Sequence, residues 1–169
     1  MAHEEIASLV AALADALRAR GWQLASAESC TGGMIAAACT DLAGSSDWFE
    51  RGVVSYSNEA KTALLGVPTA LLAQHGAVSE PVVRVMVEGV QRSSGVDLAV
   101  AVTGIAGPAG GTPIKPVGTV WFGFALRGAD GAVRITSEHR RFDGDRAQVR
   151  SATVEHALRS LLQHARESE

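Results

Sequence analysis

The sequence is poor in cysteine and has no long apolar run, and each shortage excludes a class of protein. Its only cysteines, Cys30 and Cys39, lie close together in the chain, where a disulfide framework is implausible and a reducing compartment is favoured. No apolar run approaches the roughly 20 residues that cross a bilayer, and the N-terminus carries acidic residues early. We therefore expect a soluble, cytoplasmic protein without a signal peptide or a membrane span.

Positive charge and metal-ligand patterns are also scarce. The formal net charge is −3, and the lysines and arginines are scattered rather than gathered in a stripe that could neutralise a nucleic-acid backbone. The repeated Cys/His spacing of a zinc site is absent from the sequence. We expect no nucleic-acid partner, no metal and no cofactor.

The pattern of apolar residues predicts one α/β domain over residues 1–169. A chain of 169 residues, 47% of them hydrophobic, is long enough to bury one sizeable core. Helical spacing and caps predict helices over about 6–20, 34–39, 58–65, 68–76, 79–94 and from about 145 onward. Runs rich in β-formers predict strands over 22–27, 48–56, 97–102, 117–126 and 133–142, the last two as an antiparallel hairpin. This order predicts a three-layer α/β/α sandwich with a mixed sheet.

The first segment that could carry chemistry is Glu28–Gly33, where a strand meets a helix. Free backbone N–H groups and the positive end of a helix dipole would point at one spot there, which favours an anion. The spot could hold a phosphate, or the oxyanion formed when Ser29 attacks an amide carbonyl. The alternative is a tight turn in which the glycines fit the backbone and Ser29 caps the helix.

A serine nucleophile needs a base, and no G-x-S-x-G elbow or Ser-His-Asp set is visible in the sequence. Lys61 is a candidate, because a desolvated lysine can lose its proton near neutral pH. Tyr56, the only tyrosine, could relay or orient that proton. The alternative is a surface lysine and an interfacial tyrosine, and it is weakened by the small number of lysines in the chain.

Cys30 is a rival nucleophile, because a helix N-terminus lowers a thiol pKa and His75 or His139 could pair with it. The alternative reading makes Cys30 a small packed residue that supplies a backbone N–H. His75 would then simply be a residue at a helix end that interacts with the dipole.

The glycine-rich stretch 103–111 follows a buried strand, which is where ligands bind in open α/β sheets. It matches neither G-x-G-x-x-G nor a Walker loop, so a dinucleotide or triphosphate site is not indicated. A nest of N–H groups for a sugar phosphate is one interpretation, and a flexible loop is the other. Arg146 and Arg150, one helical turn apart, could pair with a phosphate or simply be solvated.

Many ordered motifs, spanning nearly the whole chain, resemble the CinA C-terminal domain family. They are AESCTGG at 27–33, GSS at 44–46, GVVSYSNEAK at 52–61, LGV at 65–67, HGAVS at 75–79, TGIAGPAGG at 103–111 and KPVGTV at 115–120. The resemblance implies a nicotinamide-nucleotide amidohydrolase, which converts nicotinamide mononucleotide and water to nicotinic acid mononucleotide and ammonia.

The resemblance also implies roles for individual residues. Ser29 would be the nucleophile, with Lys61 and Tyr56 as its activating partners, and no metal would be required. The backbone at 30–33 would form the oxyanion hole, the loop from Thr103 would line the nucleotide site, and Arg146 would bind the phosphate. The residues implied for substrate binding are Cys30, Thr31, Gly32, Gly33, Thr103, Gly104, Gly107 and Arg146.

Two further possibilities follow from the same residues. The N–H groups could bind a pyridine nucleotide in a regulatory module that breaks no bond, or Cys30 could serve a thiol enzyme. A homodimer or higher homo-oligomer is expected, to which the apolar segment 120–124 could contribute unless it belongs to the core.

Overall fold

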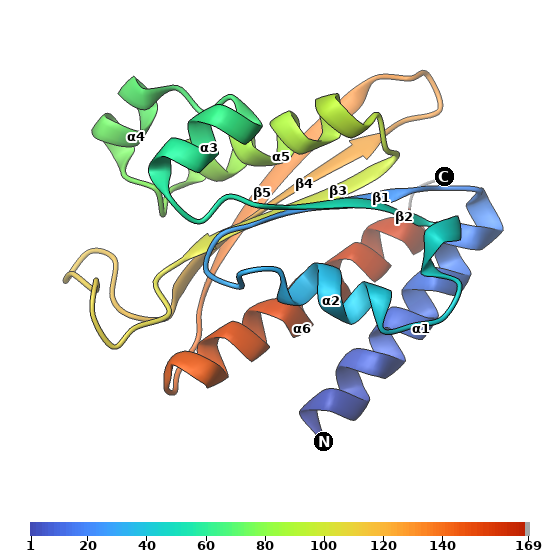
Figure 1. The fold of residues 1–169 in the computed structure, drawn as a ribbon, viewed down its shortest axis with the longest axis horizontal. Coiled ribbons are helices and arrows are strands. Elements are labelled where there is room, and N and C mark those ends of the chain that lie inside the picture. The colour runs from blue at the N-terminus through green and yellow to red at the C-terminus, as the bar shows by residue number, and fades with distance from the viewer. Residues whose placement is uncertain (168–169) are drawn as a thin grey trace.

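The computed structural model describes residues 1–167 and places a five-stranded sheet between two layers of helices (Figure 1). The sheet order is β2-β1-β3-β4-β5. Strand β1 runs parallel to β2 and β3, while β4 runs antiparallel to β3 and β5. The strands are β1 Leu24–Glu28, β2 Phe49–Val54, β3 Leu98–Gly104, β4 Thr119–Arg127 and β5 Val133–Arg141. The expected three-layer sandwich with a mixed sheet is thereby confirmed.

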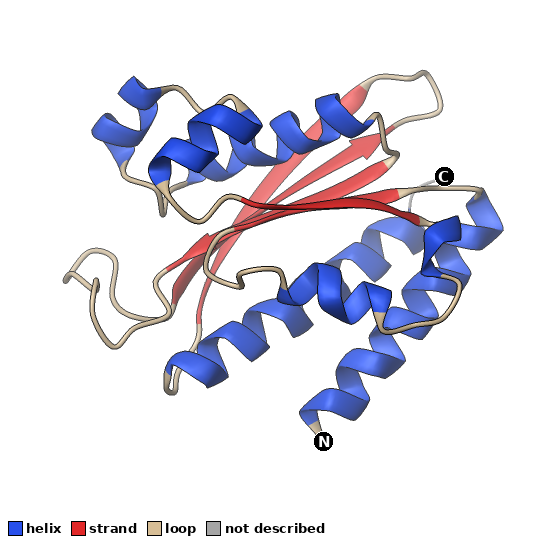
Figure 2. Ribbon diagram, viewed as in Figure 1, coloured by secondary structure: helices blue, strands red, loops and turns tan. Residues whose placement is uncertain are grey.

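Figure 2 shows that helices cover both faces of the sheet. One layer consists of α1 Ala2–Arg20, α2 Met34–Thr40 and α6 Arg146–Glu167, and the other of α3 Asn58–Leu65, α4 Thr69–His75 and α5 Glu80–Ser94. A short 3-10 turn, Ser45–Asp47, leads into β2. The expected boundaries differ from these by one or a few residues, which is where helix and strand ends are least determined by pattern.

The central strand β3 contributes to both cores of the molecule. Val100 and Val102 pack in the core beneath α1 and α6, whereas Ala99 and Ala101 belong to the core beneath α5. Because successive side chains of a strand point to opposite faces, a strand covered on both sides is continuously apolar. The smaller alanines lie on the α5 side.

Local chemistry explains where the helices begin and end. Gly21 ends α1 in the left-handed region, with φ 65°. The N-cap of α3 is Ser57, whose hydroxyl accepts a hydrogen bond from the N–H of Ala60 at 3.0 Å. Asn58 is the first residue of this helix, because Ser57 takes the extended conformation of a cap.

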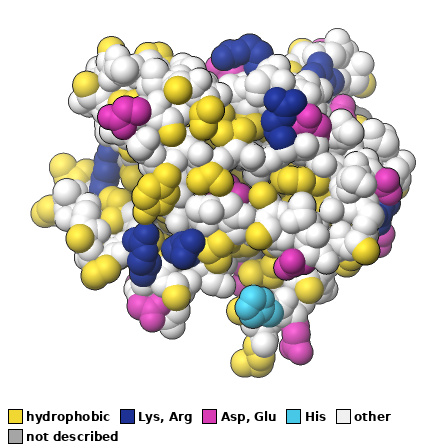
Figure 3. All heavy atoms as spheres, viewed as in Figure 1, with side chains coloured by type: hydrophobic (Ala, Val, Ile, Leu, Met, Phe, Trp, Pro, Cys, Tyr) yellow, Lys and Arg dark blue, Asp and Glu magenta, His cyan; other side chains and the backbone are white. Residues whose placement is uncertain are grey.

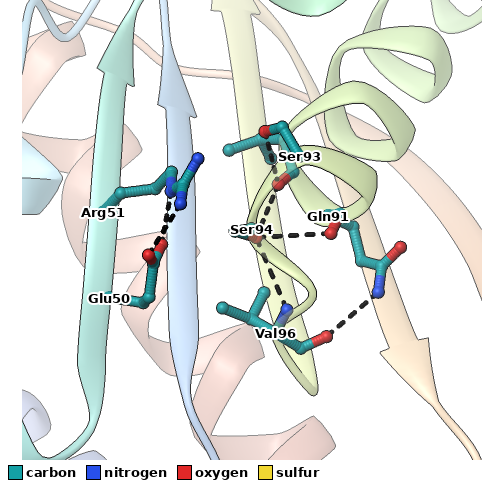
Figure 4. A network of polar contacts seen from close by, with 7 residues as sticks. Glu50, Arg51, Gln91, Ser93, Ser94 and Val96 are labelled. Atoms are coloured by element: carbon teal, nitrogen blue, oxygen red, sulfur yellow. Dashed lines mark hydrogen bonds and ion pairs between the residues drawn. The ribbon is translucent and has the colours of Figure 1, made fainter.

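The end of α5 is fixed by side-chain bonds that turn the chain into β3 (Figure 4). The Ser94 hydroxyl donates to the carbonyl of Val90 at 2.6 Å, and the Gln91 amide donates to the carbonyl of Val96 at 3.1 Å. These bonds tighten the last turn of α5 and join it to Val96, which lies two residues before β3.

The segment 120–124 lies in β4 rather than on the surface. Val120, Phe122 and Phe124 are buried in the core beneath α1 and α6, so the core alternative for this segment is confirmed.

The face of the molecule seen in Figure 3 carries its lysines and arginines in separate small groups among apolar and uncharged side chains. Within residues 1–167, no helix has the length and apolar character that a membrane span requires.

Candidate active site

Ser29 follows the last residue of β1, at the carboxyl edge of the parallel part of the sheet. Its N–H donates to the carbonyl of Val102 at 3.2 Å, which extends the pairing of β1 with β3. The N–H of Ser55 donates to the carbonyl of Glu28 at 2.8 Å on the other side. The backbone at Ser29 is therefore held between two strands, at the edge where open α/β sheets bind their ligands.

The side chain of Lys61, on α3, reaches this edge from the layer above it. Lys61 is only 1% exposed, and its amine donates to the Ser29 hydroxyl at 3.0 Å, to the Ser55 carbonyl at 2.9 Å and to the Tyr56 carbonyl at 3.2 Å. Burial lowers the pKa of Lys61, against a smaller opposing effect of Cys30. The alternative of a surface lysine is therefore wrong.

The three acceptors around the Lys61 amine differ in what they can do. The carbonyls of Ser55 and Tyr56 can only accept hydrogen bonds, whereas the Ser29 hydroxyl can also donate one. A neutral amine can therefore donate to both carbonyls and direct its lone pair at Ser29. This is the geometry that a base needs to remove the serine proton.

The N-terminus of α2 is not free, contrary to the expectation from the sequence. The buried Glu28 carboxylate accepts hydrogen bonds from the N–H of Ile35 at 2.8 Å and of Ala36 at 3.1 Å. It also accepts one from the Thr31 hydroxyl at 2.6 Å. Because Glu28 already satisfies the first turn of α2, an anion at this edge would have to bind N–H groups of the loop before the helix.

The Ser29 and Lys61 side chains open into a cleft of about 250 Å³. Seven of the expected site residues line it: Ser29, Cys30, Tyr56, Lys61, Thr103, Gly104 and Arg146. Ala106, from the loop that we expected to line the site, also contributes, and three lining residues were not expected: Asn58, Ala77 and Val78. A larger hollow of about 480 Å³ lies against α3 and α4, but it lacks both the serine and the lysine.

Tyr56 and Arg146 meet at this cleft. The Arg146 guanidinium donates to the Tyr56 hydroxyl at 3.1 Å and to the Gly107 carbonyl at 2.9 Å. Tyr56 contacts Lys61 through its main-chain carbonyl, and its side chain is 59% exposed. Arg146 thus connects the glycine-rich loop to Tyr56. Its bond to this loop uses the Gly107 carbonyl and not a loop N–H.

The far wall of the cleft is formed by the end of β3. The Thr103 hydroxyl donates to the carbonyl of Ala77 at 3.0 Å, which ties the strand to the loop before α5. A β-carbon at Gly104 would lie 2.7 Å from Val120 and 3.1 Å from the Cys30 sulfur. Glycine is therefore required here by the close approach of β4 and of Cys30.

The other expected binding residues have structural contacts instead of lining the cleft. Thr31 bonds to Glu28, the Gly32 N–H donates to the Ser29 carbonyl at 3.0 Å, and Gly33 precedes α2 in the left-handed region with φ 101°. These residues shape the loop that carries Ser29. Arg150 donates to carbonyls of this loop, so it is neither a solvated arginine nor one poised for a phosphate.

Cys30 does not have the environment of a nucleophilic thiol. Burial raises its pKa to about 11, and the charged groups that act on it are Glu28, Arg150 and Lys61. His139 packs against Trp121 with ring centroids 4.8 Å apart, and the His75 carbonyl binds Lys115. The expectation that the thiol pKa would be lowered is therefore wrong.

Glu28 lies within the motif at 27–33, but its residue type and position did not predict its role. The available signal was an acidic residue at the end of an apolar strand, one residue before a candidate nucleophile. A charged side chain in such a place must find buried partners.

Among the described residues, no group of three or more His, Cys, Asp or Glu side chains is arranged to hold a metal ion.

Fold and site together define an α/β protein with a buried serine–lysine pair at the carboxyl edge of its sheet. The chain belongs to the CinA C-terminal domain family, whose model matches residues 6–165. It is 52% identical to the nicotinamide-nucleotide amidohydrolase PncC of Enterobacter agglomerans and 50% identical to that of Escherichia coli strain K12, over 96% of each chain. The crystal structure of competence damage-inducible protein A from Klebsiella pneumoniae superimposes with a TM-score of 0.90 at 41% identity, covering 97% of this chain and 99% of that one.

Proposed function

We propose that the protein is a nicotinamide-nucleotide amidohydrolase that deamidates nicotinamide mononucleotide with Ser29 as its nucleophile. The observation that carries the proposal is the 3.0 Å contact between the buried Lys61 amine and the Ser29 hydroxyl. The amidohydrolase relatives, which match nearly the full chain, support the choice of substrate. A serine–lysine pair needs no metal to break an amide bond.

The first half of the reaction forms an ester. Neutral Lys61 removes the Ser29 proton as the oxygen attacks the carboxamide carbon, giving a tetrahedral intermediate with a negative oxygen. The protonated lysine then gives its proton to the leaving nitrogen, the C–N bond breaks and ammonia departs. Ser29 remains esterified to the pyridine carboxyl group.

The second half restores the enzyme by the same proton transfers. Lys61 removes a proton from water, the hydroxide attacks the ester carbon, and the C–O bond to Ser29 breaks. The lysine proton returns to the serine oxygen, and nicotinic acid mononucleotide leaves. One water is consumed for each amide hydrolysed, with Lys61 alternating as base and acid.

The remaining site residues bind and orient the substrate in this proposal. The Ser29 N–H already donates to Val102, so Cys30, the next residue and part of the cleft wall, supplies the N–H for the oxyanion. Arg146 binds the phosphate at the mouth of the cleft through the guanidinium N–H groups that its bonds to Tyr56 and Gly107 do not use. Tyr56 orients Lys61 through its carbonyl, and its hydroxyl faces the phosphate end.

The test is deamidation by purified, chelator-treated protein. Nicotinamide mononucleotide is the substrate, and ammonia and nicotinic acid mononucleotide are both followed, alongside Ser29→Ala and Lys61→Met proteins shown by circular dichroism to be folded. We expect turnover by the parent and a loss of at least about 10³-fold in each variant. Full activity of Ser29→Ala would contradict the proposal, and tight nucleotide binding without any turnover by the parent would favour the regulatory binding module.

A further inference from the structure

We infer that Arg150 is a positioning residue for this reaction, which fixes and polarises the backbone that presents the Cys30 N–H to the oxyanion. The inference rests on the proposed function for its chemistry. Its structural basis is the contact between Arg150, on the second turn of α6, and the loop that carries the nucleophile. Arg150 touches neither Ser29 nor Lys61 in a hydrogen bond within the described residues, so it acts through that loop.

The half-buried Arg150 side chain binds two successive carbonyls. Its Nε donates to the Cys30 carbonyl at 3.0 Å, and its Nη2 donates to the Thr31 carbonyl at 3.3 Å. The planar guanidinium offers these donors in a fixed geometry. The Cys30–Thr31 and Thr31–Gly32 peptide groups are therefore held in one orientation by a side chain from a distant part of the sequence.

The contact is passed on to Cys30 through the peptide groups themselves. The Thr31 carbonyl and the Gly32 N–H belong to one peptide group, and that N–H donates to the Ser29 carbonyl at 3.0 Å. The Ser29 carbonyl in turn shares a peptide group with the Cys30 N–H. Hydrogen bonds in such a chain polarise one another, so the charge on Arg150 strengthens the Cys30 N–H as a donor.

The charge of Arg150 is not neutralised by a carboxylate. Within residues 1–167, no ion pair joins it to an acidic residue, whereas Arg159 on the same helix pairs with Glu5 and Glu155 at 2.7 Å. The guanidinium therefore acts on the loop through its bonds to the Cys30 and Thr31 carbonyls, while the Glu28 carboxylate opposes its charge at Cys30. Polarisation along these peptide groups, rather than a net positive field, favours the negative oxygen of the tetrahedral intermediate over the neutral amide that precedes it.

The loop is held from its other side by Glu28. The Glu28 carboxylate accepts hydrogen bonds from the Thr31 hydroxyl and from α2. The Arg150 guanidinium donates to the loop carbonyls. The Cys30 N–H is left available to a ligand, since no backbone bond to it is formed within the described part of the chain.

The experiment compares Arg150→Met and Arg150→Lys with Arg159→Met, which removes a charge from the exposed side of the same helix. For nicotinamide mononucleotide, we expect Arg150→Met to lower kcat about 10- to 100-fold with KM changed less than about threefold. Arg150→Lys should recover part of kcat, and Arg159→Met should retain it. Amide exchange of Gly32, followed by NMR, should become faster in Arg150→Met than in the parent.

The two readouts separate failure of the inference from failure of the proposed function. Unchanged kcat in Arg150→Met, beside an active parent, overturns the inference and leaves the function in place. A rise in KM alone also overturns it, because that would make Arg150 a substrate ligand. A parent without turnover overturns the proposed function, and unchanged Gly32 exchange in Arg150→Met then also overturns the positioning of the loop.

Discussion

Glu28 and Ser29 are adjacent in the chain, yet their side chains bond to helices on opposite sides of the sheet. The Glu28 carboxylate binds the N–H groups of Ile35 and Ala36 in α2, whereas the Ser29 hydroxyl lies 3.0 Å from the Lys61 amine of α3. Side chains alternate between the two faces along a strand. Anchoring the acid on one face therefore fixes the direction of the serine on the other.

This relationship predicts that Glu28 is needed for folding as well as for catalysis. Glu28→Ala would leave the Thr31 hydroxyl and two N–H groups of α2 unpaired in a buried place. We expect the free energy of unfolding to fall by about 2–4 kcal/mol, measured by urea denaturation. Glu28→Gln keeps one carbonyl oxygen and should be intermediate. A Glu28→Ala protein as stable as the parent would show that the carboxylate does not hold this loop.

The lowered pKa of Lys61 predicts the pH dependence of turnover. Only the neutral amine can accept the serine proton, so kcat should rise with pH and reach a plateau. The midpoint should lie below the usual lysine value of 10.5, because burial lowers the pKa. The measurement is kcat for nicotinamide mononucleotide between about pH 6 and pH 10. Lys61→Arg, which stays protonated, should be inactive throughout, and activity in that variant would exclude Lys61 as the base.

Lys61 should also make the stability of the protein depend on pH. Its pKa is lower in the folded state than in the unfolded state, so the cost of burying the charge is fully present below the folded pKa. That cost declines as pH rises from the folded toward the unfolded pKa, because the folded state releases its proton first. Lys61→Met should therefore melt above the parent at neutral pH, by a difference that shrinks in alkali. Lys115→Met is the control for loss of one lysine, and an identical shift in both variants would contradict the explanation.

The sequence was sufficient for the fold wherever one local pattern determines an element. The continuous apolar run at 98–102 predicts a strand covered on both faces, and Val100 and Ala101 do pack in different cores. Gly21 indicates the end of α1 because only a residue without a side chain adopts its conformation without strain. Ser57 and Asn58 are both good caps, so composition alone could not place the start of α3.

Seven of the expected site residues do line the cleft, whereas the contacts that hold the Ser29 loop could not be predicted from the sequence. Ser29 and Lys61 carry local signals, a strand end and a rare lysine on a helix after a strand. The role of Arg150 depends on contacts with Cys30 and Thr31, far away in sequence. Two arginines one turn apart on a helix show the same sequence pattern whether the second one binds a loop or lies in solvent. The occupation of the α2 N-terminus by Glu28 likewise becomes visible only when the side chains are placed in three dimensions.

The bond between Arg146 and Tyr56 predicts that these residues act together on substrate binding. Arg146 donates to the Tyr56 hydroxyl at 3.1 Å, so Tyr56→Phe removes one of the contacts that hold the guanidinium over the cleft. We expect Tyr56→Phe and Arg146→Met each to raise KM, and the double variant to lose less kcat/KM than the product of the single losses. Phenylalanine leaves the carbonyl to Lys61 intact. Independent, multiplicative losses would show that the two side chains are not coupled.

The Cys30 thiol should be dispensable, although its backbone is not. Burial raises its pKa to about 11, so little thiolate exists at neutral pH and iodoacetamide should label the folded protein slowly. Cys39, buried with a pKa of about 12, should label no faster, and both should react once the chain is unfolded in urea. Cys30→Ala keeps the N–H and should retain kcat within about tenfold, whereas Ser29→Ala should lose at least about 10³-fold. The reverse pattern, activity lost in Cys30→Ala and kept in Ser29→Ala, would assign the chemistry to the thiol, because of these two side chains only the nucleophile cannot be replaced by alanine.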